Sequence, residues 1–503
     1  MKLRFGFALW LALLIGTAPV VAQERAQERA QNRGQESASR AGVLRLLPPD
    51  SVTEHAIDTP GGKLAYTATA GTLPLFDPSG EHKASVFYVA YRTHNTDPAT
   101  RPVTFVFNGG PGAASAYLHL GLVGPRRLDF GASGRDGANA KLRDNPETWL
   151  AFTDLVMIDP IGTGWSRTAK PDDAGAYYGV RADAQVIAKV IALYLAHNSR
   201  AASPKYLLGE SYGGYRAAKV ARALQDDQGV VVAGILMVSP LLEGGLHFGA
   251  AFALGCALQL PSIAASELEW RRAFTDEDQA KAERFAMTDY LTTLAGPPPK
   301  DDAGRAFYGR VAGLTGLPLN VVTKSNGCLR DDYLKSRRLA EGEVLSIYDA
   351  TFASPDPFPE SSRRRGADPV LEGFTRALGV ALVGYARDEL GFRTDMTYAL
   401  LAGEVSGKWD WPGGRNNASV SDDLRELLAL TPSFRLFITH GYSDLVIPYA
   451  VSRYVVDHLP QSDEPDRVML KLYRGGHMFY FRDDSRLAAY EDAKAFYANR
   501  KAQ

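Results

Sequence analysis

The stretch KYLLGESYGGYRAAKVARAL, residues 205–224, indicates both the fold and the chemistry of this chain. A short, almost wholly apolar segment ending at Glu210 has the pattern of a buried strand, and apolar residues at three- and four-residue steps predict a helix over 215–224. The turn between them reads G-x-S-x-G at 209–213. Glycines suit so tight a turn, because larger side chains would collide with the strand and the helix. We therefore expect Ser211 to be an exposed nucleophile at a helix N-terminus and not part of an ordinary structural turn.

Strand-like and helical patterns alternate along the rest of the chain. Runs rich in β-branched and aromatic residues predict strands at 84–92, 102–107, 155–159, 205–208, 231–238, 434–439 and 468–473. Helical periodicity appears at 182–196, 215–224, 450–459 and 485–499. Most of the strands are apolar throughout, as strands buried on both faces are. This predicts an α/β fold of the α/β-hydrolase type, a mostly parallel sheet flanked by helices.

The alternation breaks between residues 243 and 387. Polar, helix-prone and proline-rich pieces such as GPPPK and SPDPFPESSRRRG replace the buried strands there, and the strands resume near Phe434. We interpret 243–387 as an inserted cap and assign 45–242 and 388–503 to the α/β-hydrolase core. A second independent domain would have a similar composition and is the alternative.

The first residues have the pattern of an export signal. Lys2 and Arg4 precede a short apolar run, and small residues follow before Gln23, so residues 1–22 are interpreted as a cleavable secretory signal peptide. An uncleaved membrane anchor is the alternative, but the run is shorter than the roughly 20 residues that span a bilayer. The polar repeats at 23–44 predict a flexible leader. We expect a periplasmic or secreted protein with no stable membrane anchor after cleavage.

Charge and cysteine content narrow the classes further. Lys and Arg total 56 against 57 Asp and Glu, which argues against a nucleic-acid or membrane-surface binder that relies on bulk attraction. The two cysteines, Cys256 and Cys328, both fall in the predicted insertion, and an oxidising exterior favours joining them. Two unlinked buried thiols are the alternative. No pair of His or Cys has the spacing of metal ligands, so we expect neither metal nor cofactor.

A serine hydroxyl needs a neighbouring base, and in an α/β-hydrolase the acid and the histidine follow the nucleophile in chain order. The strand at 468–473 ends in a glycine-rich loop that carries His477, which we predict to be the base. The strand before it leads to Asp444, which is expected to orient the imidazole. His440 is the main competitor for the base, and His458 lies in a predicted helix. Other candidates for the acid are Asp410 and Asp457.

Backbone amides must stabilise the charge that develops on the reacting oxygen. One is expected from the residue after the nucleophile, Tyr212, and the other from a loop after an early strand. The strand at 102–107 runs into the glycine-rich loop 108–112, and we choose Gly110 as the second donor over a plain tight turn. This loop lacks a following Gly-Lys-Ser/Thr and so does not have the pattern of a phosphate-binding loop.

Four stretches in order resemble the serine carboxypeptidases, enzymes that remove single residues from peptide C-termini: NGGPGAAS (108–115), DPIGTGWS (159–166), GESYGG (209–214) and GGHM (475–478). The resemblance implies that Asn108 and Glu210 form a hydrogen-bonded pair that receives the free C-terminal carboxylate of a peptide substrate. An acid beside an amide donates to a carboxylate only while it keeps its proton. Glu210 as a mere helix-start acid is the alternative. The same motifs imply that Gly109 and Met478 contact the substrate.

The chain also departs from the family pattern. Ala113 stands where the family has a cysteine, which leaves the bracing of this loop in doubt, and the insertion gives no side-chain preference. An esterase, a lipase or an acyltransferase with the same triad is the nearest alternative function. A peptide-binding protein that keeps the fold without catalysis is an alternative of another class. The oligomeric state is not indicated by the sequence.

Overall fold

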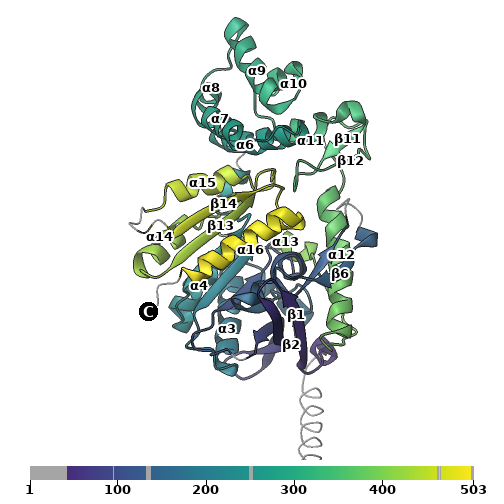
Figure 1. Cartoon of the computed structure of the whole chain (residues 1–503), viewed down its shortest axis with the longest axis vertical. Helices are drawn as coiled ribbons and strands as arrows, with labels where there is room; N and C mark the ends of the chain where they lie inside the picture. The colour runs from purple at the N-terminus through teal and green to yellow at the C-terminus, as the bar shows by residue number, and fades with distance from the viewer. Residues whose placement is uncertain are drawn as a thin grey trace, which may run out of the picture.

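The computed structural model describes residues 42–94, 96–131, 137–248, 253–460, 464 and 466–499. The predicted signal peptide and most of the predicted leader, through residue 41, lie outside the described residues. Within them, ten strands form one sheet (Figure 1), in the order β1 (Ser51–Thr59), β2 (Gly62–Phe76), β3 (His82–Thr93), β7 (Asp154–Ile158), β4 (Val103–Phe107), β9 (Lys205–Glu210), β10 (Gly234–Val238), β13 (Arg435–Gly441) and β14 (Val468–Tyr473), with β8 (Arg167–Thr168) beside β3.

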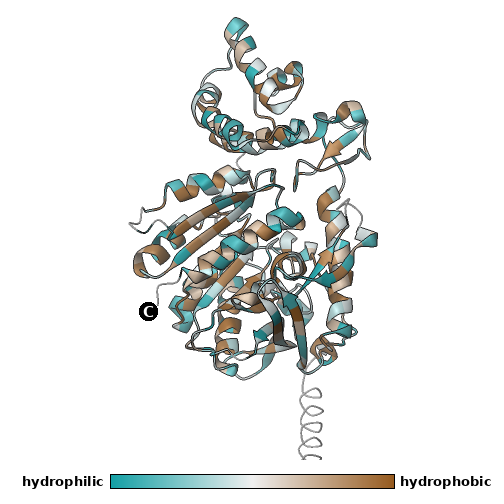
Figure 2. Ribbon diagram, viewed as in Figure 1, coloured by the Kyte–Doolittle hydropathy of each residue, from teal (hydrophilic) through white to brown (hydrophobic). Residues whose placement is uncertain are grey.

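The strand directions divide this sheet into two parts. From β7 to β14 all neighbours pair in parallel, whereas β1 pairs antiparallel with β2, β2 with β3, and β3 with β7. The central strands are apolar because both of their faces are covered, and Figure 2 shows hydrophobic residues along β13 and β14. The predicted α/β class with a mostly parallel sheet is therefore confirmed.

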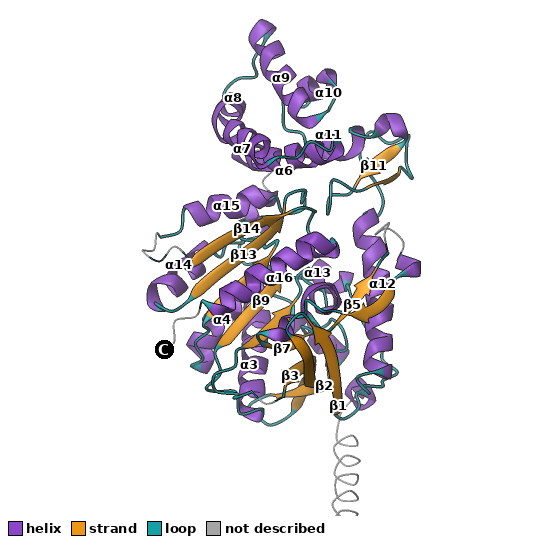
Figure 3. Ribbon diagram, in the orientation of Figure 1, coloured by secondary structure: helices purple, strands orange, loops and turns teal. Residues whose placement is uncertain are grey.

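Helices cover both faces of the sheet (Figure 3). The two faces are distinguished by alternate residues of β9, since Leu207 belongs to one hydrophobic core and Tyr206 and Leu208 belong to the other. Packed on the side of Leu207 are α3 (Val180–His197), α4 (Tyr212–Gln228), α14 (Ser421–Leu430) and α15 (Tyr449–Asp457). On the opposite side are α2 (Ala116–Leu118), η2 (His119–Val123), α12 (Pro369–Asp388) and α16 (Asp483–Ala498).

The segment between β10 and β13 contains a body of helices above the sheet in Figure 1, with its own apolar core. It consists of α5 (Gly244–Phe248), α6 (Ala253–Trp270), α7 (Asp276–Phe285), η6 (Ala286–Tyr290), α8 (Leu291–Ala295), α9 (Asp301–Thr315), α10 (Leu319–Lys324), α11 (Arg330–Ser336) and the hairpin of β11 (Glu343–Leu345) and β12 (Ala353–Pro355). Cys256 on α6 is joined to Cys328 before α11, with 5.3 Å between their Cα atoms. Leu445, from the loop after β13, packs into this same core.

Two borders differ from the sequence assignment. Residues 42–46 form η1, and Leu44 is fully buried in the main core, although residues 23–44 were assigned to the leader. Likewise α12 packs its apolar side on the main core, although the insertion was drawn through residue 387. The reason is the same in both places: apolar side chains there have the sheet within reach. Asp368 caps the amides at the start of α12, and Pro369 takes its first position.

Smaller elements complete the described structure. They are the hairpin of β5 (Arg126–Asp129) and β6 (Lys141–Asp144), the helix α13 (Gly403–Gly407), and the turns η1 (Gly42–Leu46), η3 (Gly137–Asn139), η4 (Trp149–Ala151), η5 (Pro171–Tyr177), η7 (Leu339–Glu341), η8 (Arg415–Asn417) and η9 (Phe479–Phe481). Among the described residues, none of the helices has both the length and the apolar character that crossing a bilayer would require.

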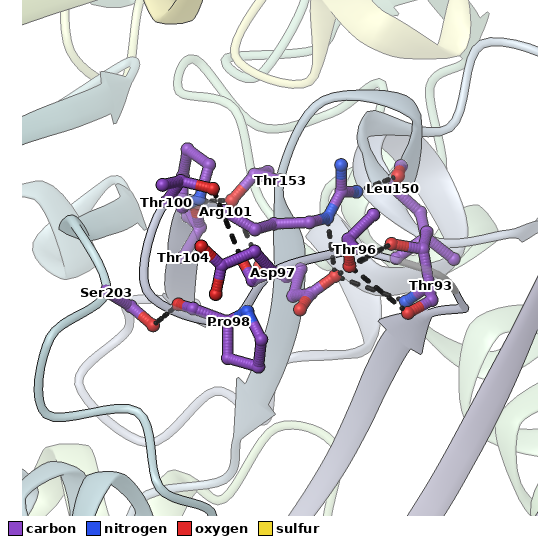
Figure 4. Close-up of polar contacts among 12 residues, drawn as sticks. Thr93, Thr96, Asp97, Pro98, Thr100, Arg101, Thr104, Leu150, Thr153 and Ser203 are labelled. Atoms are coloured by element: carbon purple, nitrogen blue, oxygen red, sulfur yellow. Dashed lines mark hydrogen bonds and ion pairs between the residues drawn. The ribbon is translucent and has the colours of Figure 1, made fainter. Parts of the chain in front are cut away.

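A polar network holds the amino ends of the parallel strands together (Figure 4). Arg101 Nε donates to Asp154 Oδ1 at 2.8 Å, and the buried Arg200 also pairs with Asp154 at the start of β7. Thr104 and Thr153 are hydrogen-bonded at 2.8 Å, which links β4 to the residue before β7. These bonds close one end of the sheet and leave the carboxyl ends of the strands for the site.

We predict that Asp183→Ala will destabilise the fold strongly. Arg216 Nε on α4 donates to Asp183 Oδ2 on α3 at 2.6 Å, and the two side chains are 0% and 5% exposed. Removing one partner leaves a buried cation uncompensated, at a cost of about 3–5 kcal/mol in the free energy of unfolding. Urea denaturation measures this cost.

The matched control is Glu372→Ala, which breaks an ion pair with Arg376 whose side chains are 45% and 84% exposed. An exposed pair contributes about 0–1 kcal/mol. Equal, small losses of stability in the two variants would contradict the structural role of the buried pair.

Candidate active site

The predicted catalytic residues and Asn108 follow strands whose carboxyl ends meet at one edge of the sheet. Asn108 follows β4, Ser211 follows β9, Asp444 lies in the loop after β13, and His477 lies in the loop after β14. Parallel strands direct their following loops to the same edge, which is where open α/β sheets bind ligands. Segments more than three hundred positions apart are thus brought to one place.

Ser211 occupies the sharp turn between β9 and α4. Its backbone has φ 60° and ψ −124°, a left-handed conformation that is unusual for a residue other than glycine. The turn is so tight that a Cβ atom added at Gly209 would lie 1.9 Å from the carbonyl oxygen of Gly213. Helix α4 begins immediately afterwards at Tyr212, so the half-buried serine lies at the positive end of the helix dipole.

His477 is held by a buried carboxylate. Its Nδ1–H donates to Asp444 Oδ2 at 2.7 Å, while Asp444 Oδ1 accepts from the amides of Val446 and Ile447 at 2.8 and 3.0 Å. The ring is thereby fixed with Nε2 available as a base. Burial lowers the pKa of the imidazole, but the Asp444 carboxylate, with a smaller effect from Glu210, holds the pKa above its ordinary value.

The serine and the histidine are linked through two consecutive residues at the end of β10. The Ser211 amide donates to the carbonyl of Val238 at 2.9 Å, and Ser239 Oγ donates to the carbonyl of His477 at 2.8 Å. In the described part of the chain no hydrogen bond joins Ser211 Oγ to the imidazole. Such catalytic bonds often tighten only when substrate binds.

The competing histidines lie in other surroundings. His440 Nε2 is hydrogen-bonded to Ser452 Oγ at 2.7 Å inside the core, where burial holds the pKa of its imidazole well below the ordinary value. His458 is exposed at the end of α15, with Nδ1 hydrogen-bonded to the carbonyl of Tyr454. The alternative acids Asp410 and Asp457 are both exposed. Of these candidates, Asp444 and His477 are hydrogen-bonded to each other.

The glycine-rich loop after β4 passes directly over the start of α4. A Cβ atom added at Gly109 would lie 2.5 Å from the Tyr212 amide nitrogen and 2.6 Å from the Glu210 carbonyl oxygen. Tyr212 is the first residue of its helix, so its N–H has no acceptor within the helix. The amides of Gly110 and Tyr212 therefore come from two segments in close contact, as a two-donor oxyanion site requires.

Asn108 and Glu210 form a buried pair beside the nucleophile. The Asn108 amide nitrogen donates to Glu210 Oε2, and its Oδ1 accepts from the Leu118 amide at 3.0 Å, which fixes the orientation of the side chain. Burial raises the pKa of Glu210 to about 7, although His477 and the hydrogen bonds from Tyr480 and Asn108 lower it. A carboxyl group with this pKa still carries its proton in mildly acidic solution.

Two further features were not predicted from the sequence. Tyr480 places its hydroxyl 3.0 and 2.9 Å from the two carboxyl oxygens of Glu210, across 270 positions of sequence. Tyr348, from the loop between β11 and β12, has its carbonyl 2.6 Å from the His477 amide and its ring edge-on to the imidazole, with 5.4 Å between centroids. No local pattern marks either residue, although Tyr480 follows the predicted base by three positions.

Met478, predicted to contact the substrate, has a side chain that packs in the main hydrophobic core and is 7% exposed.

The loop that carries Ala113 is braced without a cysteine. Its Ser115 amide donates to Asp159 Oδ1 at 2.8 Å, and residues 399–402 run alongside it, with the Ala114 and Ala402 amides bonded across. Within the described residues, no group of three or more His, Cys, Asp or Glu side chains is arranged to hold a metal ion.

Part of this chain is similar in sequence to known proteins. Residues 63–237 match the family model of the serine carboxypeptidases. A pheromone-processing carboxypeptidase of Metarhizium robertsii is 32% identical over 152 residues, which are 29% of this chain and 22% of that protein. Serine carboxypeptidase-like 41 of Arabidopsis thaliana is 27% identical over 182 residues, which are 34% of this chain and 35% of that protein. The matched regions thus span about a fifth to a third of these relatives.

A solved structure extends the likeness over most of the chain. The prohormone-processing carboxypeptidase of Saccharomyces cerevisiae aligns with 86% of this chain and 91% of its own, with a TM-score of 0.54 and 16% identity. At this identity the likeness concerns the fold, and it confirms the predicted α/β-hydrolase type. The family match over 63–237 confirms the resemblance and includes three of the four motifs, those at 108–115, 159–166 and 209–214, whereas the motif at 475–478 lies beyond it.

We predict that Gly109→Ala will impair any acyl transfer at Ser211. The added methyl group would press against the Tyr212 amide, and loss of one oxyanion donor typically lowers kcat by about 10²–10³-fold. The rate of labelling by a fluorophosphonate probe measures this effect. Gly175→Ala is the control, because nothing lies within 4 Å of the added atom. Unimpaired labelling of folded Gly109→Ala protein would contradict the assignment.

Proposed function

We propose that this chain, which is related to the serine carboxypeptidases, is an exported serine carboxypeptidase that removes C-terminal residues from peptides through an acyl-enzyme on Ser211. The observation that carries the proposal is the buried pair of Asn108 and Glu210 next to the serine. A general esterase has no need for two such donors, whereas a carboxypeptidase must recognise a free terminal carboxylate.

In the proposed reaction, Ser211 Oγ attacks the carbonyl carbon of the last peptide bond while His477 Nε2 accepts the hydroxyl proton. Asp444 stabilises the resulting imidazolium through the bond to Nδ1. The amides of Gly110 and Tyr212 bind the negatively charged oxygen of the tetrahedral intermediate. The C–N bond then breaks, and the imidazolium gives its proton to the departing amino group.

Deacylation reverses these roles with water in place of the amine. His477 takes a proton from water, the hydroxide adds to the acyl carbon, and the bond to Ser211 Oγ breaks as the proton returns to the serine. Throughout acylation, Asn108 and the protonated Glu210 each donate a hydrogen bond to the terminal carboxylate of the leaving residue. An acid and an amide suit this task because a carboxylate can only accept.

Export is part of the proposal. It is supported by the basic, apolar and small-residue pattern of residues 1–22 and by the pairing of Cys256 with Cys328, which is favoured in oxidising compartments. The N-terminal sequence of the mature protein checks it, since an intact Met1 would contradict cleavage.

We predict that the protein releases the last residue from a blocked dipeptide but not from its C-terminal amide. The amide lacks the carboxylate that Asn108 and Glu210 would bind. Chromatography of the released amino acid measures the difference. In Ser211→Ala, kcat/KM should fall by about 10⁴-fold or more, together with fluorophosphonate labelling. Equal hydrolysis of acid and amide would favour an esterase, and folded protein without activity or labelling would favour a binding protein.

We predict different pH profiles for peptides and esters. Peptide kcat/KM should fall as pH rises through the pKa of Glu210, about 7, because the ionised acid cannot donate to the substrate carboxylate. The ethyl ester of the same blocked amino acid has no carboxylate in its leaving group, so its hydrolysis should persist to higher pH. Both should fall at low pH as His477 becomes protonated. Identical alkaline limbs for the two substrates, or an unchanged limb in Glu210→Gln, would contradict the role of Glu210.

A further inference from the structure

The hydroxyl of Tyr480 lies within hydrogen-bonding distance of the Glu210 carboxyl group, which is also bonded to Asn108. Tyr480 is fully buried on η9, and its hydroxyl is 3.0 Å from Oε1 and 2.9 Å from Oε2 of Glu210. Among the described residues these are the hydrogen bonds of this hydroxyl. The pair is therefore part of a hydrogen-bonded group of three side chains: Asn108, Glu210 and Tyr480.

The Asn108 amide decides where the proton of a neutral Glu210 is carried. Its Oδ1 accepts from the Leu118 amide, so the group facing Glu210 is the nitrogen, which only donates. Glu210 Oε2 must then accept. The acidic proton is consequently favoured on Oε1, because the unprotonated oxygen of a neutral carboxyl group is the better acceptor for the Asn108 amide.

The Tyr480 hydroxyl must also donate. A buried donor without an acceptor is strongly unfavourable, and in the described structure Glu210 supplies the acceptors within reach of this hydroxyl. Since Oε1 carries the proton, Tyr480 donates to Oε2 together with Asn108. Among the described residues the Tyr480 hydroxyl is the hydrogen-bond partner of Oε1, and its own proton is on Oε2, so the Oε1–H group remains available to a ligand.

We infer that Tyr480 is a positioning residue of the carboxylate receptor: its hydroxyl holds the carboxyl group of Glu210 with the acidic proton turned toward the terminal carboxylate of the substrate. The inference rests on the proposed function. Other ionisable groups act on Glu210 only through space in the described structure. They are His477 and Asp444 on the loops after β14 and β13, Tyr117 on α2, and Tyr348 in the insertion.

The sign of the pH effect follows from the direction of the bond. A hydroxyl that donates to a carboxyl group stabilises the ionised form more than the neutral form. Burial raises the pKa of Glu210 and the Tyr480 hydrogen bond lowers it. Without the hydroxyl the pKa therefore rises, and the acid keeps its proton to higher pH. A tyrosine that accepted the acidic proton instead would produce the opposite shift.

The test is Tyr480→Phe, assayed across pH with the blocked dipeptide and with the ethyl ester of the same blocked amino acid. We expect the alkaline limb of peptide kcat/KM to move upward by about one pH unit, the KM for the peptide to rise, and the ester profile to stay unchanged. A limb that stays in place or moves downward would overturn the inference, as would an equal change for the ester.

Tyr473→Phe is the matched control. Tyr473 is also a buried tyrosine, 7% exposed, and its hydroxyl donates to a different carboxylate, Asp492 Oδ2, at 2.8 Å. Its peptide profile should match that of the wild type. If Tyr480→Phe fails to fold, 3-fluorotyrosine at position 480 replaces it: a stronger donor of the same shape should move the limb downward, and an unmoved limb would overturn the inference.

The wild-type measurements separate this inference from the proposed function. A wild-type protein that releases nothing from the free acid contradicts both. A wild-type protein whose peptide hydrolysis falls with rising pH, with the same limb in Tyr480→Phe, contradicts only the role of Tyr480.

Discussion

The parallel pairing of the central strands is the constraint on which the site depends. Because β4, β9, β10, β13 and β14 run in one direction, the loops that follow them open at a single edge, while the amino ends are closed by the network around Asp154. The backbone adds a finer constraint at that edge. Val238 and Ser239 are neighbours, and one bonds the Ser211 segment while the other bonds the His477 segment. Two loops separated by hundreds of positions are in this way tied to the end of one strand.

Burial gives this edge its chemical character. Glu210 and His477 are both removed from water, yet their pKa values shift for different reasons: burial favours the neutral acid of Glu210, whereas the Asp444 carboxylate favours the cation of His477. The proposed peptide cleavage needs a neutral acid at Glu210 together with a neutral base at His477. The proposed activity is therefore expected only in a limited range of pH, whose upper end depends on the hydrogen-bond donors around Glu210.

Much of this arrangement could be predicted from sequence, for identifiable reasons. The strand at 205–208 was predicted because strands covered on both faces are apolar throughout, and the half-buried edge strand at 468–473 because most of its residues are apolar. Ser211, Asp444 and His477 were predicted because each follows an apolar strand in a short loop. The hairpin of β1 and β2 was missed because exposed residues alternate with buried or half-buried ones along β1 and the start of β2, so that part of its sequence lacks a continuous apolar run. The insertion border was misplaced because α12 has the helical pattern of its neighbours, and only the sheet reveals where it packs. Tyr480 and Tyr348 were missed because their roles depend on contacts across the fold.

The loop between β11 and β12 connects the insertion to His477. Besides the Tyr348 contacts, this loop is hydrogen-bonded to the loop after β13. The Ala350 amide donates to the Ser443 carbonyl, the Leu445 amide donates to the Ile347 carbonyl, and Ser443 Oγ donates to Asp349. The same loop is anchored at its start by Asp368, which also caps α12. The insertion is consequently bonded to the core at the predicted site and is not structurally independent of it. A chimera that exchanged the insertion for an unrelated segment would also remove the contacts of Tyr348 with His477. Sequence changes in the insertion are therefore constrained by the need to keep His477 in position.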